Sequence, residues 1–122
     1  MALLHEEVTG KILEACFEVI NELGSGFLES VYQQALPIAL RQKSLHVQVQ
    51  VPMPVAFRGE NVGEFYADIV VEGKVVVELK AVQAILPEHQ AQLINYLKAS
   101  DIEVGLLINF GRPRLEYKRL HK

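Results

Sequence analysis

The stretch from Tyr66 to Ala81 constrains the fold of this chain more than any other part of the sequence. β-Branched residues, mostly valine, crowd both of its halves, and Glu72-Gly73-Lys74 lies between them. Because β-branched residues favour strands and glycine favours a turn, the stretch predicts a β-hairpin. Its second half is apolar enough for a central strand that is buried on both faces.

Three charged side chains, Asp68, Glu78 and Lys80, lie within this apolar hairpin. An ionised group inside a packed core costs several kcal/mol, so such charges persist only when they are paired or bound to a metal. Side chains alternate across a strand, and Glu78 and Lys80 are two apart, so both project from the same face. Asp68 joins that face only in some registers of the hairpin.

The length of the hairpin loop decides where Asp68 points. A loop with an odd number of residues, centred on Gly73, sets Asp68 directly opposite Glu78. A two-residue turn would set Asp68 opposite Val77 and point it away from Glu78. We predict the odd loop, because two facing carboxylates beside an ammonium group suit a hard cation. Oxygen ligands hold Mg²⁺ at about 2.0–2.1 Å and leave other positions for water and phosphate.

The Glu-x-Lys pattern is weak evidence when it stands alone. Glu72-Gly73-Lys74 and Glu116-Tyr117-Lys118 match it as well. The pattern at Glu78-Leu79-Lys80 differs from these because it lies in an apolar strand that pairs with an Asp-bearing strand. Ionisable groups gathered in such a setting are candidates for a functional site.

Length and composition are those of one globular domain, which we expect to cover residues 1–122. Half of the residues (50%) are hydrophobic, and no apolar run approaches the roughly 18 residues that a membrane span requires. The first residues are acidic and lack a basic region followed by an apolar segment, so we expect no signal peptide. These features predict a cytoplasmic protein without a membrane partner.

Cysteine and histidine offer no second metal site in the sequence. Cys16 is the only cysteine, which excludes an internal disulfide and a multi-cysteine zinc site. It lies in an apolar helical stripe, so we expect a buried, inert thiol. The four histidines, of which His89 lies nearest to the candidate site, lack metal-ligand spacing.

Charge is unevenly distributed along the chain. The net charge of −3 gives no global attraction to nucleic acid, and the first 40 residues hold six acidic residues and one basic residue. Residues 112–122, in contrast, hold five basic residues against Glu116 alone. A basic tail of this kind can meet phosphates, although most such runs are solvated surface.

Two helices are expected before the first strand. Apolar residues recur at three- and four-residue spacing from Val8 to Leu23, which predicts an amphipathic helix that ends at Gly24. A second helix is expected from Phe27 to about Lys43, with a kink or break at Pro37, which lacks the backbone N–H. Glu29 falls in the first turn of this helix, where the helix dipole favours an anion, so a plain capping role also explains it.

The remaining elements complete an α/β pattern. Strict alternation predicts a strand over Val47–Phe57, and prolines within it indicate an edge position or a bulge. A helix is expected from Pro87 to about Ala99, followed by an apolar strand over Val104–Phe110 and a last, half-exposed strand around 115–119. Strand, helix and strand in this order predict a right-handed crossover between parallel neighbours.

That crossover brings the third expected helix near the charged hairpin. Its N-terminal end should lie near the C-terminal end of the strand that carries Glu78. Gln92 and Tyr96 are four residues apart on this helix and project together. We therefore expect Gln92 to overlook the candidate cation site.

At this point the residues match a known family. Gly26-Phe27-Leu28-Glu29-Ser30-Val31-Tyr32 resembles the signature of the GxxExxY proteins, and the resemblance continues through Ala67-Asp68, Glu78-Leu79-Lys80, Gln92–Tyr96 and Asn109-Phe110. These proteins are assigned to the PD-(D/E)XK nuclease superfamily. The resemblance implies an α/β (α+β) fold, a restriction-endonuclease-like three-layer core with a mixed β-sheet flanked by helices. Ala67 stands where the name of the superfamily has proline.

The resemblance also implies a metal site. Asp68 and Glu78 would bind Mg²⁺ or Mn²⁺ together with the main-chain carbonyl of Leu79. Glu29 would hold a metal-bound water or a second ion. Such an ion polarises the phosphoryl oxygen and lowers the pKa of bound water, which is the chemistry of metal-assisted phosphodiester hydrolysis.

Three further side chains have implied roles at the substrate. Lys80 would orient or deprotonate the attacking water and stabilise charge on the phosphate. Gln92 would contact the backbone phosphate, with Tyr96 beside it. The resemblance thus implies an Mg-dependent phosphodiesterase, a nuclease whose substrate is nucleic acid, with DNA expected ahead of RNA.

Two alternatives to a nuclease stay open at the level of sequence. The first is a non-catalytic nucleic-acid-binding subunit that keeps the nuclease fold, in line with the small size and acidic net charge. The second is a protein-interaction domain whose acidic first helix packs on a partner or on a second copy of the chain, which would give a homodimer.

Overall fold

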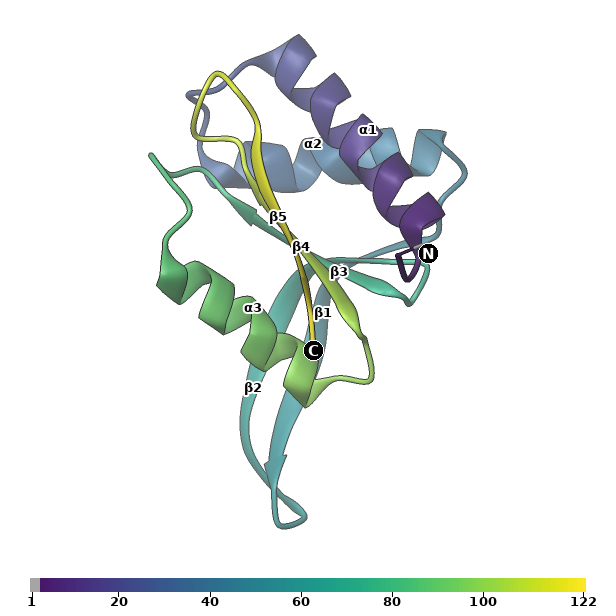
Figure 1. Cartoon of the computed structure of the whole chain (residues 1–122), viewed down its shortest axis with the longest axis vertical. Coiled ribbons are helices and arrows are strands. Elements are labelled where there is room, and N and C mark those ends of the chain that lie inside the picture. The colour runs from purple at the N-terminus through teal and green to yellow at the C-terminus, as the bar shows by residue number, and fades with distance from the viewer. Residues whose placement is uncertain (1–2) are drawn as a thin grey trace.

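The computed structural model describes residues 3–122, so the first two residues of the expected domain lie outside the described part of the chain. Three helices and five strands follow one another in this range (Figure 1). Their order is α1 (Glu6–Leu23), α2 (Glu29–Gln42), β1 (Val47–Phe57), β2 (Glu60–Val71), β3 (Val75–Lys80), α3 (Pro87–Ala99), β4 (Val104–Asn109) and β5 (Glu116–His121).

The strands form one mixed sheet in the order β1-β2-β3-β4-β5. Neighbouring strands are antiparallel except β3 and β4, which are parallel and are joined through α3. β3 is the central strand and its residues Val75–Val77 are fully buried, as expected for the second half of the charged hairpin. The predicted α/β fold with a mixed sheet flanked by helices is therefore confirmed.

The helices cover the two faces of the sheet, which produces three layers (Figure 1). α1 and α2 pack on one face, and the core there includes Ile12, Tyr32, Leu36, Val77, Leu79 and Ile108. α3 packs on the other face over a smaller cluster that includes Val70, Val76, Leu93, Leu97 and Leu107. The alternation of β3 thus directs odd-numbered side chains toward α1 and α2 and even-numbered ones toward α3.

The β1–β2 hairpin reaches beyond the rest of the sheet. β2 pairs with β3 only over Ile69–Val71, while β1 and β2 stay paired from Val47 to Phe57, so their far ends leave the sheet as a two-stranded arm (Figure 1). β1 is an edge strand, which confirms the interpretation of its prolines. The register also shifts between Val55 and Ala56, as expected for a bulge.

Two predicted helix features differ from the structure. α2 begins at Glu29 rather than Phe27, and it is continuous through Pro37, so the predicted break is wrong. Proline removes one backbone hydrogen bond, but Pro37 is buried, and Leu36 and Leu40 on either side of it are fully buried in the core. Packing of this apolar face maintains the helix across the missing bond.

Cys16 lies in the packed face of α1 and is fully buried, as predicted. Burial raises the pKa of its thiol, which keeps the sulfur protonated and unreactive. In residues 3–122 we find no helix with the length and apolar character that crossing a membrane demands.

Candidate functional site

The loop between β2 and β3 sets the position of Asp68. Val71 pairs with Val75, so three residues form the loop and the odd-loop prediction is confirmed. Glu72 and Gly73 adopt left-handed backbone with φ of 56° and 62°, and the Lys74 N–H donates to the Val71 carbonyl at 3.0 Å. The register that this loop imposes places Asp68 across from Glu78.

The two carboxylates replace backbone pairing where β2 and β3 separate. The last paired residues are Ile69 and Val77. Beyond them the Leu79 N–H donates to Asp68 Oδ2 at 2.9 Å, and the Asp68 N–H donates to Glu78 Oε1 at 3.1 Å. We call this point, formed by Asp68, Glu78 and Leu79, the fork. Its backbone bonds fix both carboxylates on neighbouring strands.

β1 also leaves its partner at Asp68. Val49 pairs with Ile69 and Val51 pairs with Ala67, so Gln50 between them is left out of the ladder and has a φ of 48°. A hollow of about 220 Å³ opens beside this interruption, and Asp68 lines it. Asp68 therefore lies where strand pairing is interrupted on both sides.

Glu29 joins the fork through a residue that the sequence did not single out. The Gln33 side-chain nitrogen Nε2 donates to Glu29 Oε2 at 3.2 Å and to Asp68 Oδ1 at 3.1 Å. Glu29 and Gln33 are four apart on α2 and therefore share one face of the helix. The amide thus connects the first turn of α2 to the fork.

Glu29, Asp68 and Glu78 all have a raised pKa. Burial, and next the charge of Asp68, raise the pKa of Glu78 to about 8. Burial also raises the pKa of Asp68, while the Leu79 N–H and then the ammonium of Lys80 oppose that rise. Burial raises the pKa of Glu29, and Lys80 opposes it most strongly. The ammonium of Lys80 thus lowers the pKa of all three carboxylates.

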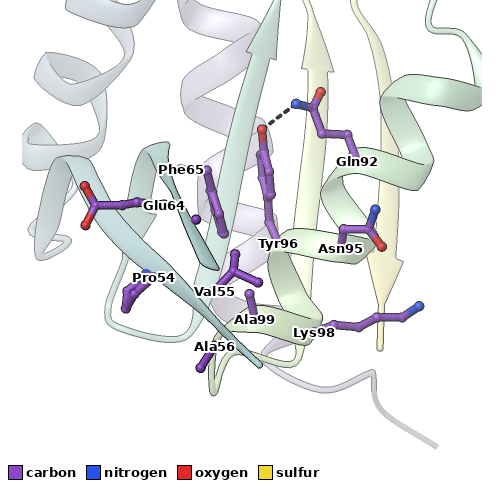
Figure 2. Close-up of a pocket in the computed structure, with 11 residues that line it drawn as sticks. Pro54, Val55, Ala56, Glu64, Phe65, Gln92, Asn95, Tyr96, Lys98 and Ala99 are labelled. Atoms are coloured by element: carbon purple, nitrogen blue, oxygen red, sulfur yellow. Dashed lines mark hydrogen bonds between the residues drawn. The ribbon is translucent and has the colours of Figure 1, made fainter. Parts of the chain in front are cut away.

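Gln92 and Tyr96 lie on α3 beside these charges. The Gln92 amide donates to the Tyr96 hydroxyl, which confirms that the two side chains project together (Figure 2). Burial, followed by the charge of Glu78, raises the pKa of Tyr96. The charge of Glu78 on β3 thus acts on the phenol of Tyr96 on α3.

A groove extends from Tyr96 along the arm. Its volume is about 860 Å³, and residues of α3 and of the β1–β2 hairpin line it (Figure 2). Within it the rings of Phe65 and Tyr96 stack, with centroids 3.7 Å apart and planes 9° apart. The groove has the size range of ligand sites, and Gln92 and Tyr96 are among the residues that line it.

Asn109 holds the chain that follows Lys80, a role that no sequence pattern predicts beyond the place of Asn109 in the resemblance. Asn109 is fully buried, accepts from the Val82 N–H at 3.0 Å and donates to the Val82 carbonyl at 2.9 Å. It also donates to Glu116 Oε1 at 3.0 Å, which in turn accepts from the Ile85 N–H at 3.0 Å. These bonds tie the segment between β3 and α3 to β4 and β5.

Gly111 lets the segment between β3 and α3 approach the backbone that follows β4. A Cβ at Gly111 would lie 2.1 Å from the Val82 carbonyl oxygen, a distance much shorter than any real contact. The Phe110 N–H donates to the Lys80 carbonyl at 2.8 Å, so the backbone next to the fork is held as well. We call Asn109, Gly111 and Glu116 with Val82 the clamp.

The other residues of the Gly26–Tyr32 signature are structural. Tyr32 is fully buried, stacks on Phe110 with centroids 4.6 Å apart, and donates its hydroxyl to the Gly24 carbonyl at 2.6 Å. Gly26 has a φ of 109°, a backbone conformation that favours glycine. These contacts fix the turn that delivers Glu29 to the start of α2.

His89 and the basic tail have structural contacts. The Leu86 N–H donates to His89 Nδ1 at 3.0 Å, which caps the start of α3. In the tail, Arg119 donates to the Thr9 hydroxyl at 3.1 Å and to the Leu4 carbonyl. His89 also lies near enough to Glu29 that its charge lowers the pKa of that carboxyl, after the effects of burial, Lys80 and Asp68.

The donor set at the fork fits a hard divalent cation. Two carboxylates from neighbouring strands converge there, and burial, followed by the charge of Asp68, raises the pKa of Glu78, so a bound cation would favour its ionised form. Among residues 3–122, however, no three His, Cys, Asp or Glu side chains come together tightly enough to hold a metal. Glu29 is linked to Asp68 of the fork through hydrogen bonds of the Gln33 amide.

Comparison with protein families identifies the chain. A model described as the PD-(D/E)XK nuclease superfamily matches residues 6–120. The chain belongs to the PD-(D/E)XK nuclease superfamily. No curated protein matches the sequence significantly.

A solved structure has a similar fold. The crystal structure of SSO0001 is 20% identical in sequence, with a TM-score of 0.59, and the match covers 76% of this chain and 50% of that chain. This chain thus spans half the length of that protein. At such identity the likeness concerns the fold alone.

Proposed function

We propose that this chain is a divalent-metal-dependent nuclease that hydrolyses phosphodiester bonds of DNA. The observation that carries the proposal is the fork, where Asp68 and Glu78 face each other across two strands with Lys80 beside them. A buried pair of like charges is costly unless a cation offsets it. Membership of a nuclease superfamily supplies the reaction class.

Within the superfamily we assign the chain to the GxxExxY proteins. The signature residues have distinct tasks that support this assignment. Gly26 and Tyr32 shape the turn before α2, while Glu29 extends toward the fork through Gln33. This division of tasks explains the spacing of the signature. Gly26 and Tyr32 fix the start of α2, and Glu29 between them is directed toward the fork.

Asp68 and Glu78 would hold Mg²⁺ or Mn²⁺ together with the Leu79 carbonyl, and Glu29 would act from the outer side of the site. When bound, such an ion supplies a polarised phosphoryl oxygen and a water of lowered pKa. Asp68 and Glu78 each accept one backbone hydrogen bond at the fork, so their positions are fixed before any ligand arrives.

Lys80 and α3 would act on the substrate. The ammonium of Lys80 lowers the pKa of all three carboxylates and is suited to orient the attacking water and to stabilise negative charge on the phosphate. Gln92 and Tyr96 would contact the phosphate backbone where the DNA strand enters the groove. Lys80 shares its strand with Glu78, so their spacing does not change as the chain moves.

The test is cleavage of labelled single- and double-stranded DNA with Mg²⁺ or Mn²⁺. Asp68→Asn keeps an oxygen that accepts the Leu79 N–H but removes the charge, so we expect the fold to persist and the rate to fall by about a hundredfold or more. Lys80→Met should cause a similar loss. Asp101→Asn, the same exchange at an exposed residue outside the site, should cleave as the wild type does.

Cleavage that needs no divalent ion, or that survives Asp68→Asn, would contradict the proposal. DNA binding without cleavage, unchanged by a chelator, would favour the non-catalytic alternative instead. RNA of the same sequence serves as the comparison that tests the assignment to DNA.

A further inference from the structure

We infer that Gln33 is a positioning residue that couples Glu29 to Asp68, so that α2 and the sheet act as one ion site. The inference rests on the proposed function, because it concerns the same site. It also decides between two explanations of Glu29, as a helix-dipole residue or as a member of the site.

The hydrogen bonds of Gln33 carry the inference. A side-chain amide nitrogen has two hydrogens, and Gln33 Nε2 directs them to two different carboxylates, Glu29 at 3.2 Å and Asp68 at 3.1 Å. In the described chain, no other group donates a hydrogen bond to the Glu29 carboxylate. The side chain of Glu29 is therefore engaged with the fork and not with the backbone at the start of α2.

The chemistry of an amide suits this position. A lysine or arginine between the two carboxylates would neutralise them and compete with a cation for the same oxygens. The neutral amide of Gln33 holds Glu29 and Asp68 together but leaves both charges in place. Each carboxylate oxygen has two lone pairs, so an oxygen that accepts from Gln33 can still bind an ion.

The backbone on which Gln33 stands is rigid. Its neighbour Tyr32 is fully buried, stacked on Phe110 and bonded to the Gly24 carbonyl. Pro37, one turn further along α2, is buried as well. Gln33 therefore bonds to Asp68 from a fixed helix. If the Gln33 side chain is removed, α2 cannot shift to compensate for the missing hydrogen bonds.

A double-mutant cycle tests the coupling. Mg²⁺ and Mn²⁺ binding would be measured by calorimetry for wild type, Glu29→Ala, Gln33→Met and the double variant. We expect each single change to weaken binding by about five- to tenfold, and the double variant to be scarcely weaker than either single one. Gln34→Met is the matched control, an exposed glutamine on the same helix, and should bind as wild type does.

Losses that simply multiply in the double variant, or a Gln33→Met affinity equal to that of the control, would overturn the inference. Asp68→Asn in the same experiment tests the proposed function separately, because it should abolish ion binding whatever Gln33 does. If Asp68→Asn binds normally, the ion site itself is misassigned.

A measurement without metal keeps the inference testable in that event. The two Nε2 protons of Gln33 are bonded to different carboxylates, so Glu29→Ala should shift one of their NMR resonances and leave the amide protons of Gln34 unchanged. Unshifted Gln33 protons would show that the bridge does not form in solution.

Discussion

At the scale of single residues, the geometry of the fork determines both the hydrogen bonds and the pKa of its carboxylates. Glu78 accepts the Asp68 N–H, and Asp68 accepts the Leu79 N–H, so each acid has a backbone partner. The same closeness sets two negative charges side by side, and burial with the charge of Asp68 raises the pKa of Glu78 to about 8. The folded chain therefore binds a proton that the unfolded chain releases.

This predicts a pH dependence of stability in metal-free buffer. Glu78 titrates near 4.5 when unfolded and near 8 when folded, so the folded state holds the extra proton between these values. Its contribution is present below pH 4.5 and is lost as pH rises through 8, at about 1.36 kcal/mol per pKa unit. Urea unfolding at several pH values should show a decline of a few kcal/mol.

Glu78→Gln is the decisive variant for this prediction. It keeps an oxygen that can accept the Asp68 N–H and removes the titrating group. Its free energy of unfolding should therefore decline much less between pH 5 and pH 8. A decline as steep as that of the wild type would assign the effect to another group.

At the scale of elements, the ends of β3 and β4 are held together by the clamp. Asn109 fixes both polar atoms of the Val82 backbone, and the Lys80 carbonyl accepts from Phe110. The segment between β3 and α3 is thereby bound near both of its ends, since Glu116 accepts from Ile85. The distance from Lys80 to α3 depends on this set of contacts.

Gly111→Ala is expected to break the clamp. The added Cβ would lie 2.1 Å from a backbone oxygen that cannot turn aside, so the segment after β3 must move. Overpacking of this kind costs about 1–3 kcal/mol or more, which thermal or urea unfolding would measure. Gly63→Ala is the control, because a Cβ there has no atom within 4 Å.

The elements also mark how far the sequence could predict the site. The hairpin and its odd loop could be predicted because unpaired buried charges are costly, so Asp68 and Glu78 were expected to lie on the same face. Gln33 and Asn109 carry no such signal, because neutral amides are common anywhere and their partners lie 35 and 27 residues away. The predicted break at Pro37 was wrong because core packing outweighs one missing hydrogen bond.

At the scale of the whole molecule, α2 and the sheet meet at the fork. α2 contributes Glu29 and Gln33, and the β2–β3 hairpin contributes Asp68 and Glu78. These parts lie on different layers, so a ligand bound among them would stabilise the assembly as a unit. The net charge of −3 adds to the demand for a cation there.

Mg²⁺ is therefore expected to stabilise the folded protein. At a concentration one hundred times its Kd, binding to the native state alone raises the free energy of unfolding by about 2.7 kcal/mol. The rise should be larger at pH 8.5 than at pH 6, because Glu78 must lose its proton to bind an ion. Thermal unfolding with Mg²⁺ and then with excess chelator measures it.

Two controls accompany the measurement of Mg²⁺-dependent stability. Asp68→Asn should gain nothing from Mg²⁺, and sodium chloride at matched ionic strength should not reproduce the gain. An equal rise in the variant would point to general screening of acidic residues and away from a site at the fork.

The hydrogen bonds at the fork maintain the fold independently of the charges that would bind an ion. Backbone N–H groups at Asp68 and Leu79 require an oxygen acceptor, and an amide oxygen serves them as well as a carboxylate does. A descendant with asparagine and glutamine in place of the two acids would keep this architecture while losing its affinity for ions. Inactive scaffolds can therefore arise from such a protein in two conservative steps, without passing through an unfolded ancestor.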